Sequence, residues 1–175
     1  MSTDLIKVNV GGVNIVDTIT NVKTGKVDVI KRDHNIVVDT TLKLIMGMLK
    51  GSLKGIQYWA VGKGLASWDN TPVKPLITED RLTTELGRKP ILESAIVYVD
   101  PDTYKVSNTP TNCLSIGCTF DETDCNGEWR EFGIFGGNAT ADKDSGFMID
   151  KKHHSVFTKT EDMVVDRKLY LTISF

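Results

Sequence analysis

The chain has 175 residues, of which 40% are hydrophobic and 25% are charged, and its formal net charge is −2. These values are ordinary for a globular protein and exclude an intrinsically disordered chain. Basic and acidic residues are mixed along the whole length, so we expect no surface for nucleic acid or for anionic lipid.

The N-terminal region, residues 1–34, carries no motif that we can name. Its first residues lack the basic start and long apolar centre of a signal peptide, and no apolar run in the chain reaches membrane-spanning length. We therefore expect assembly in a cytoplasm without membrane insertion. Residues 1–34 are expected to form either an extra hairpin or an arm that reaches a neighbouring subunit.

A short helix is predicted at about residues 40–49. Asp39 can cap its amino end and Gly51 can close it. Four apolar residues fall on one face at helical spacing: Leu42, Ile45, Met46 and Leu49. We expect this face to cover a sheet.

Residues 65–90 are predicted to be a long crossover that wraps the outside of the fold. The segment holds three of the five prolines, Pro72, Pro75 and Pro90, and mixes them with polar residues. A brief helical pattern occurs at 81–86. Before the crossover, Gly62 and Gly64 follow an apolar strand, and we interpret them as a β-bulge or turn, because the third glycine of a dinucleotide-binding motif is missing.

Short runs rich in Val, Ile, Tyr, Phe and Thr recur between clusters of Gly, Asn, Asp and Pro, which is typical of an antiparallel sandwich or barrel. Residues 112–120 and 169–175 alternate most clearly between apolar and small or polar side chains. Asn126-Gly127 is the strongest hairpin signal, and it predicts that 112–120 pairs with 128–135 through an acidic tip.

The run 129–135 has large apolar groups on both faces. Strict alternation would place Arg130, Phe132 and Ile134 on one face, with Trp129 and Phe135 on the other. A strand that is apolar on both faces is covered on both. The second cover is either the helix and crossover of the same chain or a partner subunit.

Together these elements predict an all-β fold, a jelly-roll-like β-sandwich with one short helix and a long wrapping crossover. We expect residues 1–175 to form a single domain, since this length fits one hydrophobic core.

The order of three segments resembles virion proteins of tailed bacteriophages, particularly small tail-fibre or baseplate-appendage domains. The first is 35–39, which leads into the helix; the second is 58–64, followed by the crossover and 85–88; the third is 129–137, followed by two closing strands. The resemblance covers about residues 35–175. It implies a structural role in particle assembly or host attachment.

Metal chemistry has weak signals in this sequence. Residues 121–127 have some of the oxygen-rich character of a calcium loop, but Gly133 stands where the closing carboxylate would be needed, so we interpret them as a solvated turn. Cys113, Cys118 and Cys125 do not have zinc-site spacing, and we expect reduced thiols. We predict no metal and no cofactor.

Catalytic motifs are also incomplete. Only His34, His153 and His154 could serve as a base, and each lies in a charged neighbourhood, so we expect surface residues. No nucleophile elbow is present, and no carboxylate pair for glycoside hydrolysis can be chosen from the sequence. The expectation is therefore a protein that is not an enzyme, with no catalytic residues.

Aromatic residues are the remaining candidates for contact with a ligand or partner. Tyr58, Trp68 and Trp129 could form a platform that stacks on sugar rings, although core packing is the leading explanation for most of them. Trp68 is the most interesting, because it lies beside polar residues.

The leading hypothesis is a non-enzymatic virion component, tail-fibre or baseplate-associated, that acts through contacts with other virion subunits and forms a homo-oligomer. Its location would be the virion, after assembly in the host cytoplasm. The alternatives are a carbohydrate-binding module for a host-surface glycan, a capsid decoration or head-fibre protein and, more distantly, a hydrolase on a β-sandwich.

Overall fold

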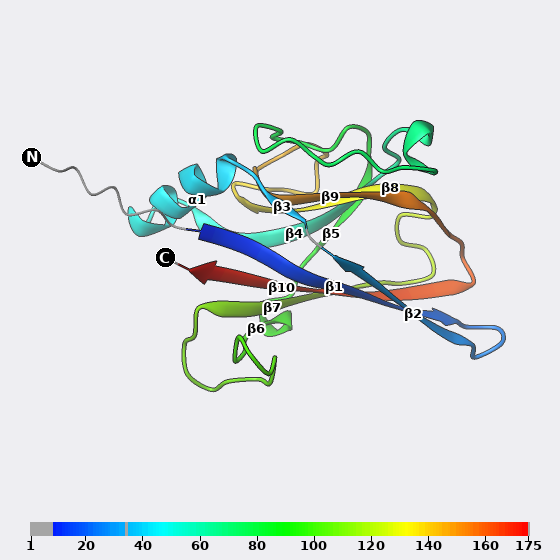
Figure 1. The fold of residues 1–175 in the computed structure, drawn as a ribbon, viewed down its shortest axis with the longest axis horizontal. Helices are drawn as coiled ribbons and strands as arrows, with labels where there is room; N and C mark the ends of the chain where they lie inside the picture. Colours follow the sequence, from blue (N-terminus) through cyan, green and yellow to red (C-terminus); the bar gives the residue numbers. More distant parts are fainter. Residues whose placement is uncertain (1–8, 34, 175) are drawn as a thin grey trace, which may run out of the picture.

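The computed structural model describes residues 9–33 and 35–174, which form two antiparallel five-stranded sheets packed face to face (Figure 1). Sheet A has the order β2 (Val27–Asp33), β1 (Asn9–Asn21), β10 (Met163–Ser174), β7 (Cys113–Phe120) and β6 (Ile96–Tyr98). Sheet B has the order β3 (Ile36–Val37), β9 (Phe147–Lys159), β8 (Gly127–Gly137), β4 (Lys54–Gly62) and β5 (Glu85–Pro90). The predicted all-β sandwich is confirmed.

The main core lies between the sheets and follows the alternation of their strands. In β7, Ile116 and Phe120 are fully buried while Thr119 between them is exposed, as the sequence pattern predicts. In β10, Leu169 and Leu171 point into the same core. Both strands are where the sequence placed them, although the last residue, Phe175, lies outside the described residues.

Residues 9–33 form a hairpin that is integral to sheet A. The strands β1 and β2 pair from Asn14↔Asp33 to Thr20↔Val27, and Gly25 gives their turn its positive φ of 69°. On its other side β1 pairs with β10 along its length. The hairpin is therefore an integral part of sheet A, with β2 as its edge strand.

The predicted hairpin between β7 and β8 is wrong. The strand β7 pairs with β10 and β6, whereas β8 pairs with β4 and β9 in the other sheet. Residues 121–126 thus cross from sheet to sheet, with positive φ at Cys125 and Gly127. The reason is that both strands bury an apolar face, and these faces pack against each other across the core instead of pairing edge to edge.

Helix α1 (Thr40–Leu49) has the predicted bounds, and Gly51 closes it with a φ of 73°. The predicted buried face is wrong. Thr41 and Leu44 are the buried residues, and the hydroxyls of Thr40 and Thr41 donate to the carbonyls of Met148 and Ile149 in β9. These bonds, and not a side-chain cap from Asp39, fix the helix on the sheet and turn its more apolar face outward.

The crossover covers the outer face of sheet B (Figure 1), and in this structure it ends at residue 84, because β5 replaces the helical pattern predicted at 81–86. It contains one turn of 3-10 helix, η1 (Ala66–Trp68); a second, η2 (Glu93–Ala95), precedes β6. Leu82 of the crossover packs with Ala60, Phe135 and Met148 in a second apolar cluster on this face. The chain itself therefore supplies the second cover of β8.

Strict alternation fails in β8 at Arg130 and Glu131, where the pairing with β9 is irregular and the extra residues lie in β9. Trp129 pairs with Phe157, but Glu131 pairs with His153, so the register shifts between them. Both charged side chains point to the crossover, and Trp129 joins Phe132 and Ile134 in the main core. The faces predicted for Trp129 and Arg130 were therefore exchanged.

Candidate functional site

The three aromatic residues predicted to contact a ligand or partner lie apart from one another. Trp129 is fully buried, and its indole N–H donates to the Cys125 carbonyl at 2.7 Å. Its ring packs edge-on against Phe120 and Phe157. No face of this ring is left for a ligand in the folded chain, which corrects its assignment as a contact residue.

Trp68 is also buried, with 5% of its surface exposed. One face stacks on His153, with ring centroids 3.8 Å apart, and the ring also lies so close to Gly64 that an added Cβ there would be 2.4 Å away. Trp68 therefore holds the crossover on sheet B instead of presenting a platform. Tyr58 in β4 is half-buried beside Arg88 and is the one member of the predicted set with appreciable exposure.

A buried polar network fastens the crossover to sheet B. The carboxylate of Glu131, fully buried, accepts backbone N–H bonds from Gly64 (3.2 Å), Thr83 (2.9 Å) and Thr84 (2.8 Å). Its second oxygen lies 3.2 Å from the Lys151 amine. A carboxylate can be buried at tolerable cost only when its oxygens are bonded in this way, so Glu131 acts as the anchor of the crossover.

His153 and His154 were predicted to be surface residues, and this is wrong because both are buried. His153 lies beside the network, with its Nδ1 2.7 Å from the Val73 carbonyl and its Nε2 3.9 Å from carboxylate oxygens of Glu79 and Glu131. Burial lowers the pKa of both rings, that of His154 to about 3. His34 lies outside the described residues.

The same network lowers the pKa of Glu79 in the crossover. Burial raises the pKa of this carboxyl, but the hydrogen bonds from the Leu76 N–H and from the Lys151 amine outweigh that effect, and the net pKa is lowered. Lys151, 1% exposed, donates to Glu79 at 2.5 Å and to the Arg81 carbonyl at 3.0 Å. These groups are used in holding the crossover.

The acidic loop between the sheets, residues 121–126, is built around an amine. Lys159 of β9 is 1% exposed, and its Nζ donates to the carbonyls of Asp121 (2.6 Å) and Glu122 (3.3 Å) and to Asn126 Oδ1 (2.8 Å). Two backbone carbonyls and one side-chain oxygen of this loop therefore surround an ammonium group. Within the described ranges, no group of three His, Cys, Asp or Glu side chains is arranged to hold a metal ion.

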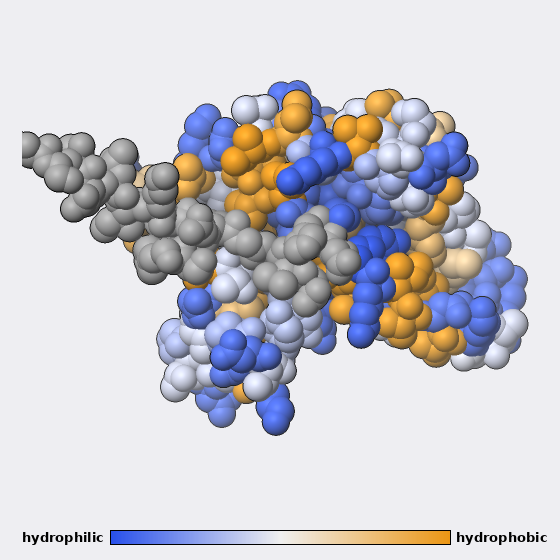
Figure 2. All heavy atoms as spheres, viewed as in Figure 1, coloured by the Kyte–Doolittle hydropathy of each residue, from blue (hydrophilic) through white to orange (hydrophobic). Residues whose placement is uncertain are grey.

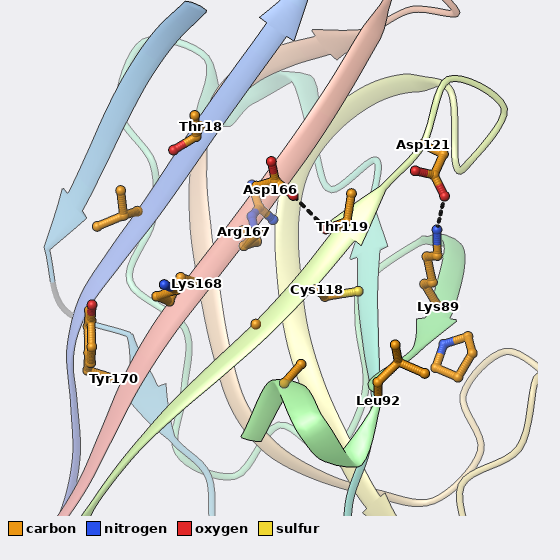
Figure 3. A pocket seen from close by; sticks show the side chains of 14 residues that line it. Thr18, Lys89, Leu92, Cys118, Thr119, Asp121, Asp166, Arg167, Lys168 and Tyr170 are labelled. Carbon is orange, nitrogen blue, oxygen red and sulfur yellow. Dashed lines mark hydrogen bonds and ion pairs between the residues drawn. The ribbon is translucent and has the colours of Figure 1, made fainter. Parts of the chain in front are cut away.

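A shallow groove of about 590 Å³ lies over the outer face of sheet A and past the edge of β7 (Figure 3). In it, the hydroxyl of Thr119 donates to Asp166, and the amine of Lys89 binds Asp121 at 2.6 Å. Leu92 and Tyr170 add apolar surface at opposite ends.

Cys118 is the cysteine among the residues that line this groove, and a thiol can act as a nucleophile only as the thiolate. Burial raises the pKa of its thiol to about 12, and the neighbouring Lys89 and Arg167 offset this only in part. A thiol in that state carries almost no thiolate at neutral pH. Among the described residues that line the groove there is also no histidine.

The outward face of α1 is an exposed apolar surface. We call Leu42, Met46 and Leu49 the helix patch; their exposed fractions are 55%, 65% and 78%. Ile77 of the crossover, also exposed, lies beside it, because its carbonyl accepts the Asp39 N–H at 2.9 Å. Figure 2 shows apolar atoms gathered over the part of the molecule where α1 and the crossover lie. Such a patch on a protein whose core is already filled is typical of an interaction surface.

No family model and no curated protein matches the chain. Over the part of the chain that the structure describes, no helix has the length and apolar character needed to cross a membrane.

The sequence contained the signal for the helix patch, since the spacing of Leu42, Met46 and Leu49 was recognised as one face. What it did not contain was the direction of that face. The threonine hydroxyls that bond to β9 decide this direction, and neither Thr40 nor Thr41 stands out in the sequence.

Proposed function

We propose that this chain is a non-enzymatic structural component of a tailed-phage-type particle, associated with a tail fibre or baseplate, and that it acts through protein–protein contacts. The assignment to such a particle is supported by the resemblance to virion proteins, which lies in the order of the segments 35–39, 58–64 and 129–137. The helix patch supports the mode of action, and it is the observation on which the proposal rests.

The argument for contact starts from the cost of exposed apolar surface. Both faces of sheet B are already covered by the chain itself, so the helix patch is not needed to complete the core. Apolar side chains at positions i, i+4 and i+7 of a helix are the arrangement that docks into an apolar groove or against a second helix. Burying such side chains contributes about 25 cal/mol per Å².

The partners are other subunits of the particle, including further copies of this chain in a homo-oligomer. A symmetric contact would place the helix patch of one copy against that of the next. The exposed Ile77 would extend the contact onto the crossover.

The test compares two variants in which one exposed apolar residue becomes charged. Met46→Glu lies in the helix patch, whereas Val106→Glu, 70% exposed, lies in the loop 99–112 on the other sheet. Particles whose genome lacks this gene are complemented with each variant, and the chain is quantified in purified particles by mass spectrometry. We expect wild type and Val106→Glu to be incorporated, and Met46→Glu to be reduced at least tenfold.

Both variants should unfold within about 0.5 kcal/mol of wild type, because both positions are exposed; unfolding in urea checks this. Equal incorporation of the two variants would remove the helix patch from the proposal. If the wild-type chain is absent from the purified particles, the proposed structural role itself is wrong.

A further inference from the structure

The groove over the outer face of sheet A (Figure 3) is open to solvent and has the volume of a small-molecule site, about 590 Å³. We call it the sheet A groove. Three of its polar side chains are exposed, those of Thr119, Asp166 and Lys168. A ligand can therefore reach them directly from solution.

The floor of the sheet A groove includes a glycine within a strand. Gly117 of β7 pairs with Lys168 of β10. Two residues further along β7, Thr119 pairs with Asp166 on the same face. On the other side, β6 pairs with β7 only as far as Ile116. Since Gly117 has no side chain, it leaves a gap between Lys168 and the edge of β7, and this gap is part of the groove.

Neither packing nor backbone geometry requires glycine at position 117. Its φ lies outside the positive range. A Cβ built on Gly117 would meet the Ala95 carbonyl oxygen first among the described residues, at 3.7 Å, which is an ordinary van der Waals contact. Glycine weakens a strand, and one use for it there is the close approach of a ligand to the backbone. The open space above Gly117 therefore accounts for this residue.

One end of the sheet A groove is an aromatic wall that the protein holds in place. Tyr170 of β10 lines the groove, and its ring packs against that of Tyr104 with centroids 4.4 Å apart. Tyr104 has a φ of 54°, which is uncommon for a residue with a side chain. Asp100 stabilises this turn, since its Oδ1 accepts the N–H groups of Asp102 and Thr103 at 3.1 and 2.8 Å. A ring positioned before the ligand arrives lowers the entropic cost of binding.

The opposite end of the groove is apolar. Leu92, with 69% of its surface exposed, lies there together with Pro90 and Ala95. Figure 3 shows Tyr170 and Leu92 on either side of β7. Apolar surface at both ends, with polar groups between, suits a sugar ring, because a pyranose has apolar C–H faces and hydroxyl groups around its rim.

The polar groups between these ends do not favour a charged ligand. Asp166 and Lys168 have no ion-pair partner among the described residues, and their charges are of opposite sign. The Asp166 carboxylate accepts the Thr119 hydroxyl and has further lone pairs, while the Lys168 amine has three N–H donors. The other lining cations are bonded to carboxylates of the protein: Lys89 to Asp121 and Asp124, and Arg167 to Asp17. A neutral ligand with hydroxyl groups matches this lining.

We infer that the sheet A groove binds a neutral pyranose unit of a glycan. The ring lies over Gly117, between Tyr170 and Leu92. One of its hydroxyls donates to Asp166, and another accepts a hydrogen bond from Lys168. The inference does not depend on the proposed structural role, since the helix patch shares no residue with this groove.

A nitrogen-15 NMR titration of the full chain tests this with the methyl glycosides of glucose, galactose, mannose and N-acetylglucosamine. Glycerol is the control, because it has hydroxyl groups but no ring. We expect at least one glycoside to shift the backbone resonance of Gly117 and to bind at least tenfold more tightly than glycerol. If no glycoside moves this resonance, or if glycerol binds equally, the inference is wrong. Tighter binding of glucose 6-phosphate than of every neutral probe would also overturn it.

The variant Gly117→Val locates the site, with Thr20→Val as its control. Valine at position 117 would fill the floor of the groove, and it suits a strand. Thr20 lies on the same outer face, in β1, but does not line the groove. Gly117→Val should weaken binding of the glycoside at least tenfold, and Thr20→Val less than twofold. Equal affinity in the two variants would overturn the inference.

Unfolding in urea separates blocked binding from a damaged fold. Gly117→Val should be at least as stable as wild type, because valine is favoured over glycine in a strand. If this variant does not fold, Gly117→Ala takes its place, since a Cβ has room at this position. A folded Gly117→Ala variant that binds the glycoside as tightly as wild type would then contradict the inference.

Discussion

The outer faces of the two sheets differ in what covers them. On sheet A, Thr119, Asp166 and Lys168 are exposed, and each alternates with a buried neighbour. On sheet B, the crossover and α1 form a third layer, so that charged residues such as Glu131 and Lys151 are fully buried. The comparison shows that alternation describes a strand with one buried face, whereas a strand between two layers can hide charges if each is bonded.

The largest test of this difference is the variant Glu131→Ala. It would leave three backbone N–H groups of the crossover without an acceptor and would remove one carboxylate from Lys151. Breaking a buried ion pair in this way costs about 3–5 kcal/mol. Unfolding in urea, followed by circular dichroism, measures the loss.

The matched control is Asp166→Ala on the outer face of sheet A. Asp166 is exposed and bonds only to the Thr119 hydroxyl among the contacts found for its side chain in the described residues. Its removal should change the free energy of unfolding by less than about 0.5 kcal/mol. Similar losses in both variants would mean that the crossover is not held as the geometry indicates.

A smaller effect is expected from replacing two glycines with alanine. The two free-energy costs together distinguish backbone strain from side-chain packing under the crossover. Gly25 and Gly64 both have positive φ, 69° and 52°, but an added Cβ meets nothing within 4 Å at Gly25, while at Gly64 it would lie 2.4 Å from the Trp68 ring. Gly25→Ala should cost about 1–2 kcal/mol from the left-handed backbone alone. Gly64→Ala should cost about 1–3 kcal/mol more, because the ring must move.

Urea unfolding of the two alanine variants gives this difference directly. Equal costs would show that Trp68 moves freely and that the start of the crossover packs loosely on sheet B.

The third prediction concerns pH and Asp150 in β9. Burial raises the pKa of this carboxyl to about 7, from an ordinary value of 3.8, and its hydrogen-bond donors, the Ile134 N–H and the Asn35 amide, are uncharged. Between these two pH values the folded chain holds a proton that the unfolded chain has lost. The contribution of Asp150 to stability therefore falls as the pH rises through this window.

The variant Asp150→Asn removes this titration. Relative to wild type, its free energy of unfolding should rise by on the order of 1 kcal/mol per pH unit between pH 5 and 7. The difference between the two proteins is the quantity to measure, because His154 titrates in both and acts in the opposite direction. Parallel stability curves would show that Asp150 is ionised throughout.

Much of the fold was predictable because it depends on local patterns. The alternation of 112–120, the bounds of α1 and the bulge expected near Gly62 are all present in the structure. Each follows from side-chain spacing or from a glycine that permits a positive φ.

The errors have a common physical cause, which is that the sequence does not show what lies across from a residue. Asn126-Gly127 indicates a tight turn, but only the packing of β7 against β8 decides that the turn joins two sheets. His153 lies in a charged run that resembles a surface, and the crossover buries it from 80 residues away in sequence. The break in alternation at Arg130 and Glu131 has no glycine to reveal it.

The amine of Lys159 inside the loop between the sheets has one more consequence. A loop whose oxygens are held by a dissolved cation is stabilised only while that ion is present at sufficient concentration. Here the positive charge is bonded covalently to the neighbouring strand, so its local concentration never changes. The loop can therefore keep its shape in solutions of very different ionic content.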